Sequence, residues 1–275
     1  MLRQLPLAGA GETGRLAAVL GRIRHKIFVM SGKGGVGKSS VSVNLATALS
    51  DMGYKTGLLD LDLHGPSVPG LLGIKDGGRA AGDSALLMPV RARENLLVLS
   101  LDILLRDRDQ AVIWRGPKKN AAIRQLLAGA DWGDLDFLFM DSPPGTGDEH
   151  LAVLRFIPDV LCLVVTTPHQ VALADARKTI SFLRATQAAA LGVVENMSLL
   201  HCPHCGEKIH LSSGSGEELA AKSGLSFLGA VPFDPEASRA ADAGVPAADI
   251  PGANPAKEAY SALAAAVVRL LSERV

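Results

Sequence analysis

The segment Gly32 to Ser39, GKGGVGKS, constrains the fold of this chain more than any other stretch. It matches the pattern G-x-x-x-x-G-K-[ST] and follows a short apolar run, HKIFVMS, at 25–31. Residues 39–53 then carry apolar side chains at helical spacing and end at a glycine. Between a strand and a helix, this pattern binds phosphate, because its backbone N–H groups turn inward around the oxygens. We therefore expect a phosphate-binding loop here.

Strand-like and helix-like segments alternate along the rest of the chain. Buried strands are expected at 54–62, 96–104, 136–141, 160–167, 191–197 and 227–233. Helices are expected at 117–129, 148–156, 171–186, 216–224 and 254–274. Apolar residues make up 48% of the chain and aromatic residues only 4%, which suits aliphatic helices packed on a parallel sheet. The order predicts an α/β fold with a doubly wound, mostly parallel sheet flanked by helices.

The chain is long enough for one large α/β domain. We expect this domain to span 25–275, with a metal-binding loop at about 197–210 and a loosely attached N-terminal arm at 1–24. Residues 74–93 are rich in glycine and charge and predict a mobile surface loop.

Charge and cysteine content narrow the class of partner. Lys plus Arg and Asp plus Glu both total 28, so net charge favours neither nucleic acid nor an anionic membrane. No apolar run reaches the roughly 18–20 residues of a membrane helix, and the first residues do not resemble a secretory signal. Three cysteines do not make a disulfide framework. These features predict a cytoplasmic protein that binds neither nucleic acid nor a membrane.

Acidic residues at two expected strand ends complete a candidate site for Mg²⁺ and a nucleoside triphosphate. Lys38 is expected to reach the β- and γ-phosphates, and the Ser39 hydroxyl to ligate Mg²⁺. Asp141 ends a strand, where ligands bind in open parallel sheets, and is expected to hold Mg²⁺ through a water. Asp62 is the first candidate to orient the attacking water, with Asp60 second. The alternative for each is an aspartate that only caps a turn.

A lysine directly after the first glycine, Lys33, makes this loop similar to those of the deviant Walker A ATPases, which include the nitrogenase iron protein, MinD and ParA. Six further segments more narrowly resemble the Mrp/ApbC branch, over about residues 25–270: DLDLHGPS, IWRGP (113–117), DSPPGTGDEHL, TTPHQVALADARK, ENMS and CPHCG. The resemblance implies an ATP-binding iron–sulfur cluster carrier or scaffold that works as a homodimer and supplies apo iron–sulfur proteins. The chain lacks the N-terminal cluster of four cysteines found in cytosolic eukaryotic relatives.

The resemblance also implies roles for particular residues. Lys33 is similar to an arginine finger that crosses the dimer interface and touches the phosphates of the other subunit. Spacing alone instead favours a solvated loop lysine. Asn196 resembles the family's adenine-contacting asparagine, and the VPFDP loop at 231–235 a second wall of the base site. The guanine-reading N-K-x-D pattern is absent, so ATP is expected. The predicted nucleotide-binding residues are Gly32, Lys33, Gly34, Gly35, Val36, Gly37, Lys38, Ser39, Ser40, Asn196 and Pro232.

Cys202 and Cys205 form a C-x-x-C pair near the other end of the chain. One pair supplies two thiolates, while a [4Fe–4S] cluster or a tetrahedral zinc usually takes four ligands. A two-fold dimer supplies a second pair, so a cluster on the symmetry axis fits, as the resemblance implies. Two alternatives stay open: a zinc site in one chain that adds His201, His204 or His210, and a redox pair. Cys162 is expected in the core.

Three functions compete on this sequence. The first is the homodimeric ATPase that carries an iron–sulfur cluster, with slow hydrolysis of ATP. The second is a positioning ATPase similar to MinD or ParA with a structural zinc at the C-x-x-C loop, for which the C-terminal helix would have to be amphipathic and available. The third is an electron-transfer ATPase similar to the nitrogenase iron protein, but that family places its cluster cysteines singly on two separate loops.

Overall fold

The centre of the protein is an eight-stranded sheet, seen in a computed structural model that describes residues 12–75, 87–100, 116–202 and 204–274. The strand order is β10-β7-β6-β1-β5-β2-β4-β3. All neighbouring strands are parallel except β3 and β4, which are antiparallel. The strands are β1 (Ile23–Met30), β2 (Thr56–Asp60), β3 (Val90–Arg93), β4 (Leu96–Ser100), β5 (Leu135–Asp141), β6 (Leu161–Thr166), β7 (Ala189–Glu195) and β10 (Phe227–Ala230).

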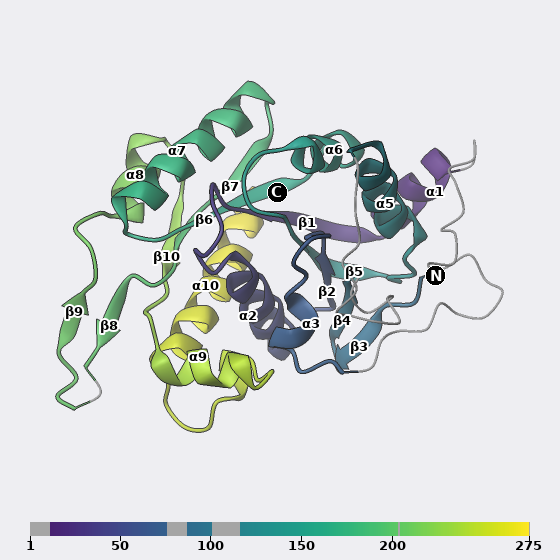
Figure 1. The fold of residues 1–275 in the computed structure, drawn as a ribbon. Helices are drawn as coiled ribbons and strands as arrows, with labels where there is room; N and C mark the ends of the chain where they lie inside the picture. Colours follow the sequence, from purple (N-terminus) through teal and green to yellow (C-terminus); the bar gives the residue numbers. More distant parts are fainter. Residues whose placement is uncertain (1–11, 76–86, 101–115, 203, 275) are drawn as a thin grey trace.

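Helices cover both faces of the sheet (Figure 1). One face carries α1 (Glu12–Leu20), α5 (Gly116–Gly129), α6 (Asp148–Phe156), α7 (Gln170–Ala185) and α8 (Gly216–Lys222). The other carries α2 (Lys38–Asp51), α3 (Val68–Leu71), α9 (Pro235–Asp242), the 3-10 turn η1 (Ala247–Asp249) and α10 (Pro255–Ser272). This arrangement confirms the predicted doubly wound α/β fold.

The alternation of side chains along the central strand explains the two layers. Phe28 and Met30 of β1 enter the core under α5, α6 and α7, whereas Ile27 and Val29 enter the core under α2 and α10. All four are fully buried. A strand that is apolar on both faces is stable only between two layers of helices. In the strand order, β1 lies near the middle of the sheet. Its last residue therefore delivers the following loop to the centre of the carboxyl edge.

Two segments differ from the sequence-based expectation. Residues 12–24 of the predicted arm form α1 and the start of β1, and Leu16 and Leu20 are buried against the domain; residues 1–11 lie outside the described residues. In the predicted loop at 74–93, residues 90–93 instead form the edge strand β3, because Val90 and Arg91 pair with β4. Residues 76–86 of that loop, 101–104 of the strand predicted at 96–104 and 113–115 of the IWRGP motif lie outside the described residues.

Helix α10 has an apolar stripe that is already in use. Tyr260, Leu263, Ala264, Val267 and Leu271 are buried, and the helix packs against α2 and β10. Among the helices that the structure describes, we find none with both the length and the apolar character to cross a bilayer. The apolar side of α10 therefore belongs to the domain core.

Helices α3 and α9 come into contact through two glycines. Gly73 and Gly244 have left-handed backbones, with φ of 63° and 75°. A Cβ atom on Gly73 would lie 2.9 Å from the carbonyl oxygen of Gly244, and one on Gly244 would lie 2.5 Å from the Cα of Gly73. Both distances are below any ordinary contact, so only glycine fits at either position.

Candidate functional site

The phosphate-binding loop, residues 31–37, lies between β1 and α2 and is packed closely on its neighbours. A Cβ atom on Gly32 would come within 2.4 Å of the backbone carbonyl group of Asp175, in α7. A Cβ atom on Gly37, which has a left-handed φ of 77°, would come within 2.1 Å of the Nδ2 of Asn196. The glycines therefore serve two purposes. They give the loop the freedom to wrap around phosphate, and they let Asp175 and Asn196 pack directly against its backbone.

Lys38, Ser39 and Asp141, predicted from separate motifs, meet at the carboxyl edge of the sheet. The Nζ of Lys38 lies 2.7 Å from Oδ2 of Asp141 in a buried ion pair. The Ser39 hydroxyl donates to the same oxygen at 2.6 Å. These are the ammonium, hydroxyl and carboxylate groups that a phosphate chain and Mg²⁺ require in a phosphate-loop protein. The donor set fits Mg-nucleotide.

Ser42 also belongs to this site, although it was not predicted from the motifs. Its hydroxyl donates to Oδ1 of Asp141 at 2.6 Å, so each carboxylate oxygen of Asp141 has a hydroxyl donor. Ser42 follows Lys38 by one helical turn, and residues four apart lie on one face of a helix. That spacing was the available signal. Ser42 holds the carboxylate plane in place under Lys38 and Ser39.

Asp60 is a buried neighbour of Asp141. The two residues are register partners at the ends of β2 and β5. Asp60 is 1% exposed and accepts hydrogen bonds from the backbone N–H groups of Asp62 at 3.0 Å and Val68 at 3.3 Å. Burial, together with the adjacent Asp141 carboxylate, raises the pKa of Asp60 to about 8. Asp60 therefore shapes the 61–68 loop from inside.

Asp62, the predicted water-orienting residue, lies on the partly exposed part of that loop. One of its carboxylate oxygens, Oδ1, accepts from the backbone N–H groups of His64 and Gly65, each at 3.2 Å. The structure thus brings Asp62 to the same edge of the sheet as Lys38 and Asp141, on a loop held by Asp60. Its role toward water stays a prediction.

Asn196 and Pro232, the two predicted base-site residues, lie on adjacent segments. Asn196 is 5% exposed, and its Nδ2 donates to the carbonyl of Val36 at 2.9 Å, so the amide supports the phosphate-binding loop. The segment that contains Pro232 is joined to the end of β7, because Val231 donates to the carbonyl of Glu195 at 2.8 Å. Base contact by either residue stays a prediction.

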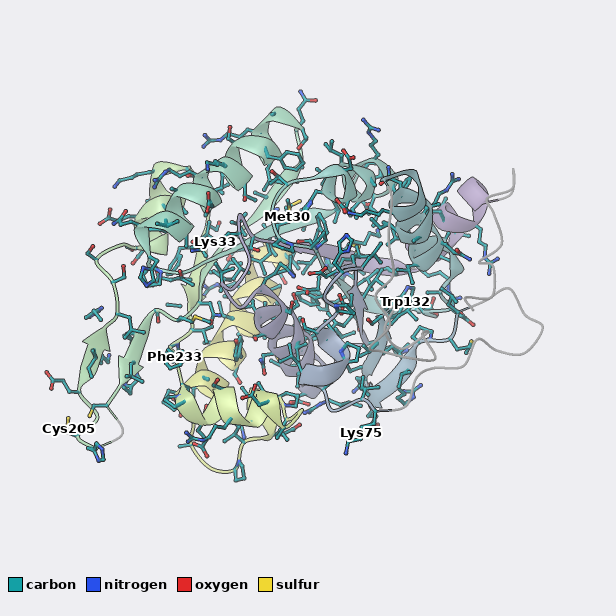
Figure 2. All side chains as sticks on the ribbon, viewed as in Figure 1. Met30, Lys33, Lys75, Trp132, Cys205 and Phe233 are labelled. Carbon is teal, nitrogen blue, oxygen red and sulfur yellow. The ribbon has the colours of Figure 1, made fainter. Side chains whose placement is uncertain are left out.

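A mostly apolar cavity of about 360 Å³ opens beside the phosphate-binding loop. Lys33, Met197, Leu200 and Phe233 are among its lining residues, so it extends from the loop to the hairpin described below. Figure 2 shows Lys33 and Phe233 on the side of the molecule that faces this hairpin. Lys33 makes no ion pair with any residue in the described ranges.

Cys202 and Cys205 lie at the tip of a two-stranded hairpin, β8 (Leu199–His201) and β9 (Lys208–His210), which projects from the domain (Figures 1 and 2). Cys202 closes the turn: its N–H donates to the carbonyl of Glu207 at 2.9 Å, and its carbonyl accepts from Gly206 at 2.8 Å. Cys205 is exposed and Cys202 partly exposed. Backbone hydrogen bonding from Cys205 and His204 lowers the pKa of the Cys202 thiol. The turn therefore favours a thiolate.

The third cysteine is chemically distinct. Cys162, in β6, is fully buried, and burial raises its pKa to about 12. It is a core thiol, as predicted. Around the hairpin, with Pro203 outside the described residues, no three His, Cys, Asp or Glu side chains converge as a metal-binding set.

The fold and this site define a P-loop nucleotide-binding protein that carries an exposed cysteine pair. The family model for the NUBPL iron-transfer P-loop NTPase matches residues 22–268. The chain belongs to that family, which confirms the resemblance to iron–sulfur cluster carriers that its motifs showed.

Individual relatives and solved structures agree with this family assignment. The chain is 42% identical over 239 residues to an iron–sulfur cluster carrier protein of Methanocaldococcus jannaschii, which covers 86% of this chain and 82% of that protein. It is 47% identical over 245 residues to the human cytosolic Fe-S cluster assembly factor NUBP2, covering 86% and 88%. A nucleotide-binding protein of Archaeoglobus fulgidus, solved in complex with ADP, is 36% identical with a TM-score of 0.74, covering 84% of this chain and 91% of that one. MinD of Pyrococcus furiosus, at 24% identity and a TM-score of 0.65 over 90% and 99%, shares the fold.

Proposed function

We propose that the protein is a homodimeric, slowly hydrolysing ATPase that holds a [4Fe–4S] cluster between its subunits and delivers it to apo iron–sulfur proteins. The observation that carries the proposal is the hairpin tip, which presents two cysteines on a projecting turn and stabilises the thiolate of one. A [4Fe–4S] cluster takes four thiolates, and two copies of this hairpin supply four. Family membership supports iron–sulfur transfer as the purpose.

The nucleotide site has a defined task for each predicted residue. Lys38 binds the terminal phosphates, Ser39 ligates Mg²⁺, and Asp141 holds Mg²⁺ through a water while Ser42 fixes its carboxylate. Asp62 orients the attacking water. Lys33 reaches the phosphates of the partner subunit and stabilises the charge that develops there. The ADP-bound relative supports nucleotide binding at this loop.

The family placement also supports the surroundings that we propose. Relatives named as cytosolic assembly factors favour a cytoplasmic protein whose partners are a second copy of itself and cluster recipients, with neither nucleic acid nor a membrane. A MinD-like positioning role is the second candidate, on the likeness in fold. The buried apolar stripe of α10 argues against a membrane-binding use of that helix.

Anaerobic reconstitution with iron and sulfide tests the proposal. We expect about four irons per dimer and a brown chromophore, and loss of both in Cys202→Ser and in Cys205→Ser, because a symmetric site then keeps only two thiolates. Cys162→Ala is the matched control: it removes a buried thiol and should keep the cluster. Zinc bound at one per monomer, with no uptake of iron, would contradict the carrier function.

A further inference from the structure

His150, in the first turn of α6, lies behind the loop that joins β5 to α6, residues 142–147, and has no role in the function described so far. The residue is fully buried. Its Nδ1 accepts a hydrogen bond from the backbone N–H of Gly147 at 3.1 Å. The ring packs against Phe28, with ring centroids 5.5 Å apart, and edge-on against Phe182 at 6.5 Å. The imidazole is therefore held rigidly on the inner side of this loop.

The ring is neutral and carries its proton on Nε2. Burial lowers the pKa of His150 to about 4, outweighing the Glu149 carboxylate and the Pro143 carbonyl, which favour the charged form. In a neutral imidazole only one nitrogen carries hydrogen, and Nδ1 acts here as the acceptor. The Nε2 atom is buried and makes no hydrogen bond of ordinary geometry in the described part of the chain, although the Pro143 carbonyl acts on the ring as a weak backbone acceptor. A buried unpaired donor is costly, so it favours any rearrangement that gives it an acceptor.

The loop in front of His150 is joined to the nucleotide site at two points. It begins directly after Asp141, and Gly145 donates to the carbonyl of Ser31, at the start of the phosphate-binding loop, at 3.0 Å. Behind it, the start of α6 is fixed to α5 by the ion pair of Glu149 with Lys119 at 2.6 Å. The helix start is therefore a fixed support, and the loop is the part that can adjust to a terminal phosphate.

We propose that His150 is a positioning residue for the 142–147 loop, holding Gly147 through Nδ1 and donating from Nε2 to the Pro143 carbonyl when the loop closes on the γ-phosphate. Pro143 is chosen because its carbonyl already acts on the ring as a weak backbone acceptor, which closure of the loop would turn into a full hydrogen bond. The inference rests on the proposed ATP-binding function and deepens it. His150 touches no reacting atom, so it acts on discrimination between ATP and ADP through the loop.

Three substitutions separate the two hydrogen bonds. His150→Asn keeps an acceptor near the position of Nδ1, His150→Gln keeps a donor near that of Nε2, and His150→Leu keeps neither. Phe182→Leu is the matched control, because it removes a ring contact without touching a hydrogen bond. Calorimetry with Mg-ADP and with a non-hydrolysable Mg-ATP analogue gives the preference for the triphosphate. Hydrogen exchange of the 142–147 backbone gives a readout that needs no hydrolysis.

We expect the affinity for Mg-ADP to stay within about twofold of the wild type in all variants. The preference for the triphosphate should fall about 3- to 10-fold in His150→Leu, by less in His150→Asn and His150→Gln, and not in Phe182→Leu. In the wild type, the analogue should slow exchange of the Gly147 amide relative to ADP; in His150→Leu it should not.

A wild-type preference and wild-type exchange in His150→Leu would overturn the inference, as would an equal loss of both nucleotides in His150→Leu and Phe182→Leu, which indicates packing alone. If His150→Leu does not fold, the Asn and Gln variants decide, because each removes one hydrogen bond and stays polar. Wild-type protein that binds neither nucleotide would instead remove the proposed function, and the inference with it.

Discussion

The side-chain amide of Asn196 joins the phosphate-binding loop to the chain that enters the cysteine hairpin, donating to the carbonyl of Val36 at 2.9 Å. Three residues later the chain enters β8, and Cys202 directly follows the end of that strand. The segment that leaves the hairpin also packs closely on the domain, because a Cβ atom on Gly214 would lie 2.2 Å from the carbonyl oxygen of Pro168. Both legs of the hairpin are thus attached beside the nucleotide site, although its tip projects from the domain.

We expect Asn196→Ala to uncouple the two sites. The change leaves the buried Val36 carbonyl without its donor, which costs about 1–3 kcal/mol in the free energy of unfolding. Alkylation of Cys202 by iodoacetamide should depend on Mg-ATP in the wild type and lose that dependence in the variant. Asn44→Ala is the control, since Asn44 also donates to a carbonyl, that of Ser40 at 2.8 Å, but does not lead to the hairpin. Nucleotide dependence that persists in Asn196→Ala would contradict the coupling.

Lys38→Ala should affect both nucleotide binding and folding. It removes a charge-assisted phosphate contact, so ATP hydrolysis should be lost and the affinity for Mg-ATP weakened. It also leaves the fully buried Asp141 carboxylate without its cation, which destabilises the fold by about 3–5 kcal/mol. Calorimetry and urea unfolding measure the two effects. Lys178→Ala, which breaks the exposed ion pair with Asp175, should change stability by about 0.5 kcal/mol or less. Unchanged ATP affinity in Lys38→Ala would remove the phosphate-loop assignment.

Lys33→Ala should abolish hydrolysis while each subunit still binds ATP, because the lysine acts on the other subunit's phosphates. Its position agrees with this, since it lines the cavity toward the hairpin and makes no ion pair in the described residues. Mixing Lys33→Ala with Lys38→Ala tests it: a heterodimer pairs one intact phosphate site with one intact Lys33, so part of the activity returns. A mixture that stays inactive despite demonstrated subunit exchange would refute action across the interface.

Two buried groups make opposite contributions to the pH dependence of stability. The pKa of Asp60 is raised to about 8, so the folded state holds a proton that the unfolded state has lost, and stability falls as pH rises from about 4 to 8. The pKa of His150 is lowered to about 4, so stability falls as pH drops from about 6.5 to 4. The two slopes offset each other below about pH 6.5. Between about pH 6.5 and 8, Asp60 is the only one of the two groups that makes stability depend on pH.

Asp60→Asn should therefore flatten the stability profile above about pH 6.5 and expose a loss of stability below it. Each group contributes at most about 1.4 kcal/mol per pH unit. Urea unfolding at about pH 5, 6, 7 and 8 measures the profile. Asp134→Asn is the control, because Asp134 is an exposed partner of Arg22 and should leave the profile unchanged. Parallel profiles for Asp60→Asn and the wild type would show that Asp60 is ionised in the folded protein.

Local sequence patterns predicted the elements of the sheet and the meeting of Lys38, Ser39 and Asp141, because each of these features follows from a run of neighbouring residues. The pattern G-x-x-x-x-G-K-[ST] implies its own strand and helix, and Asp141 ends an apolar run. Contacts made across the chain were not predictable in this way. The support of the loop by Asn196 joins residues 160 positions apart. No motif pointed to His150, and only its burial and its hydrogen bond with Gly147 show that it matters.

The hairpin and the edge strand were missed for a related reason. Strands β8, β9 and β3 are three or four residues long, too short for the alternation of side chains to be recognised. Their pairing depends on neighbours: β3 is held by β4, and β8 is joined to the segment at 231–233 through the hydrogen bond from Phe233 to Leu199 at 2.7 Å. A short strand is defined by its partner, which the local sequence does not contain.

The contact between Gly73 and Gly244 has a consequence for how the two ends of the nucleotide site can vary. Helix α3 follows the loop that contains Asp62, and α9 follows the segment that contains Pro232. A single added methyl group at either glycine acts as a wedge that drives these helices apart. The loop expected at the phosphates and the segment expected at the base then shift together, although neither has been altered. Substitution at this pair should therefore change the geometry of the nucleotide site from a distance, while every residue proposed to touch the nucleotide stays the same.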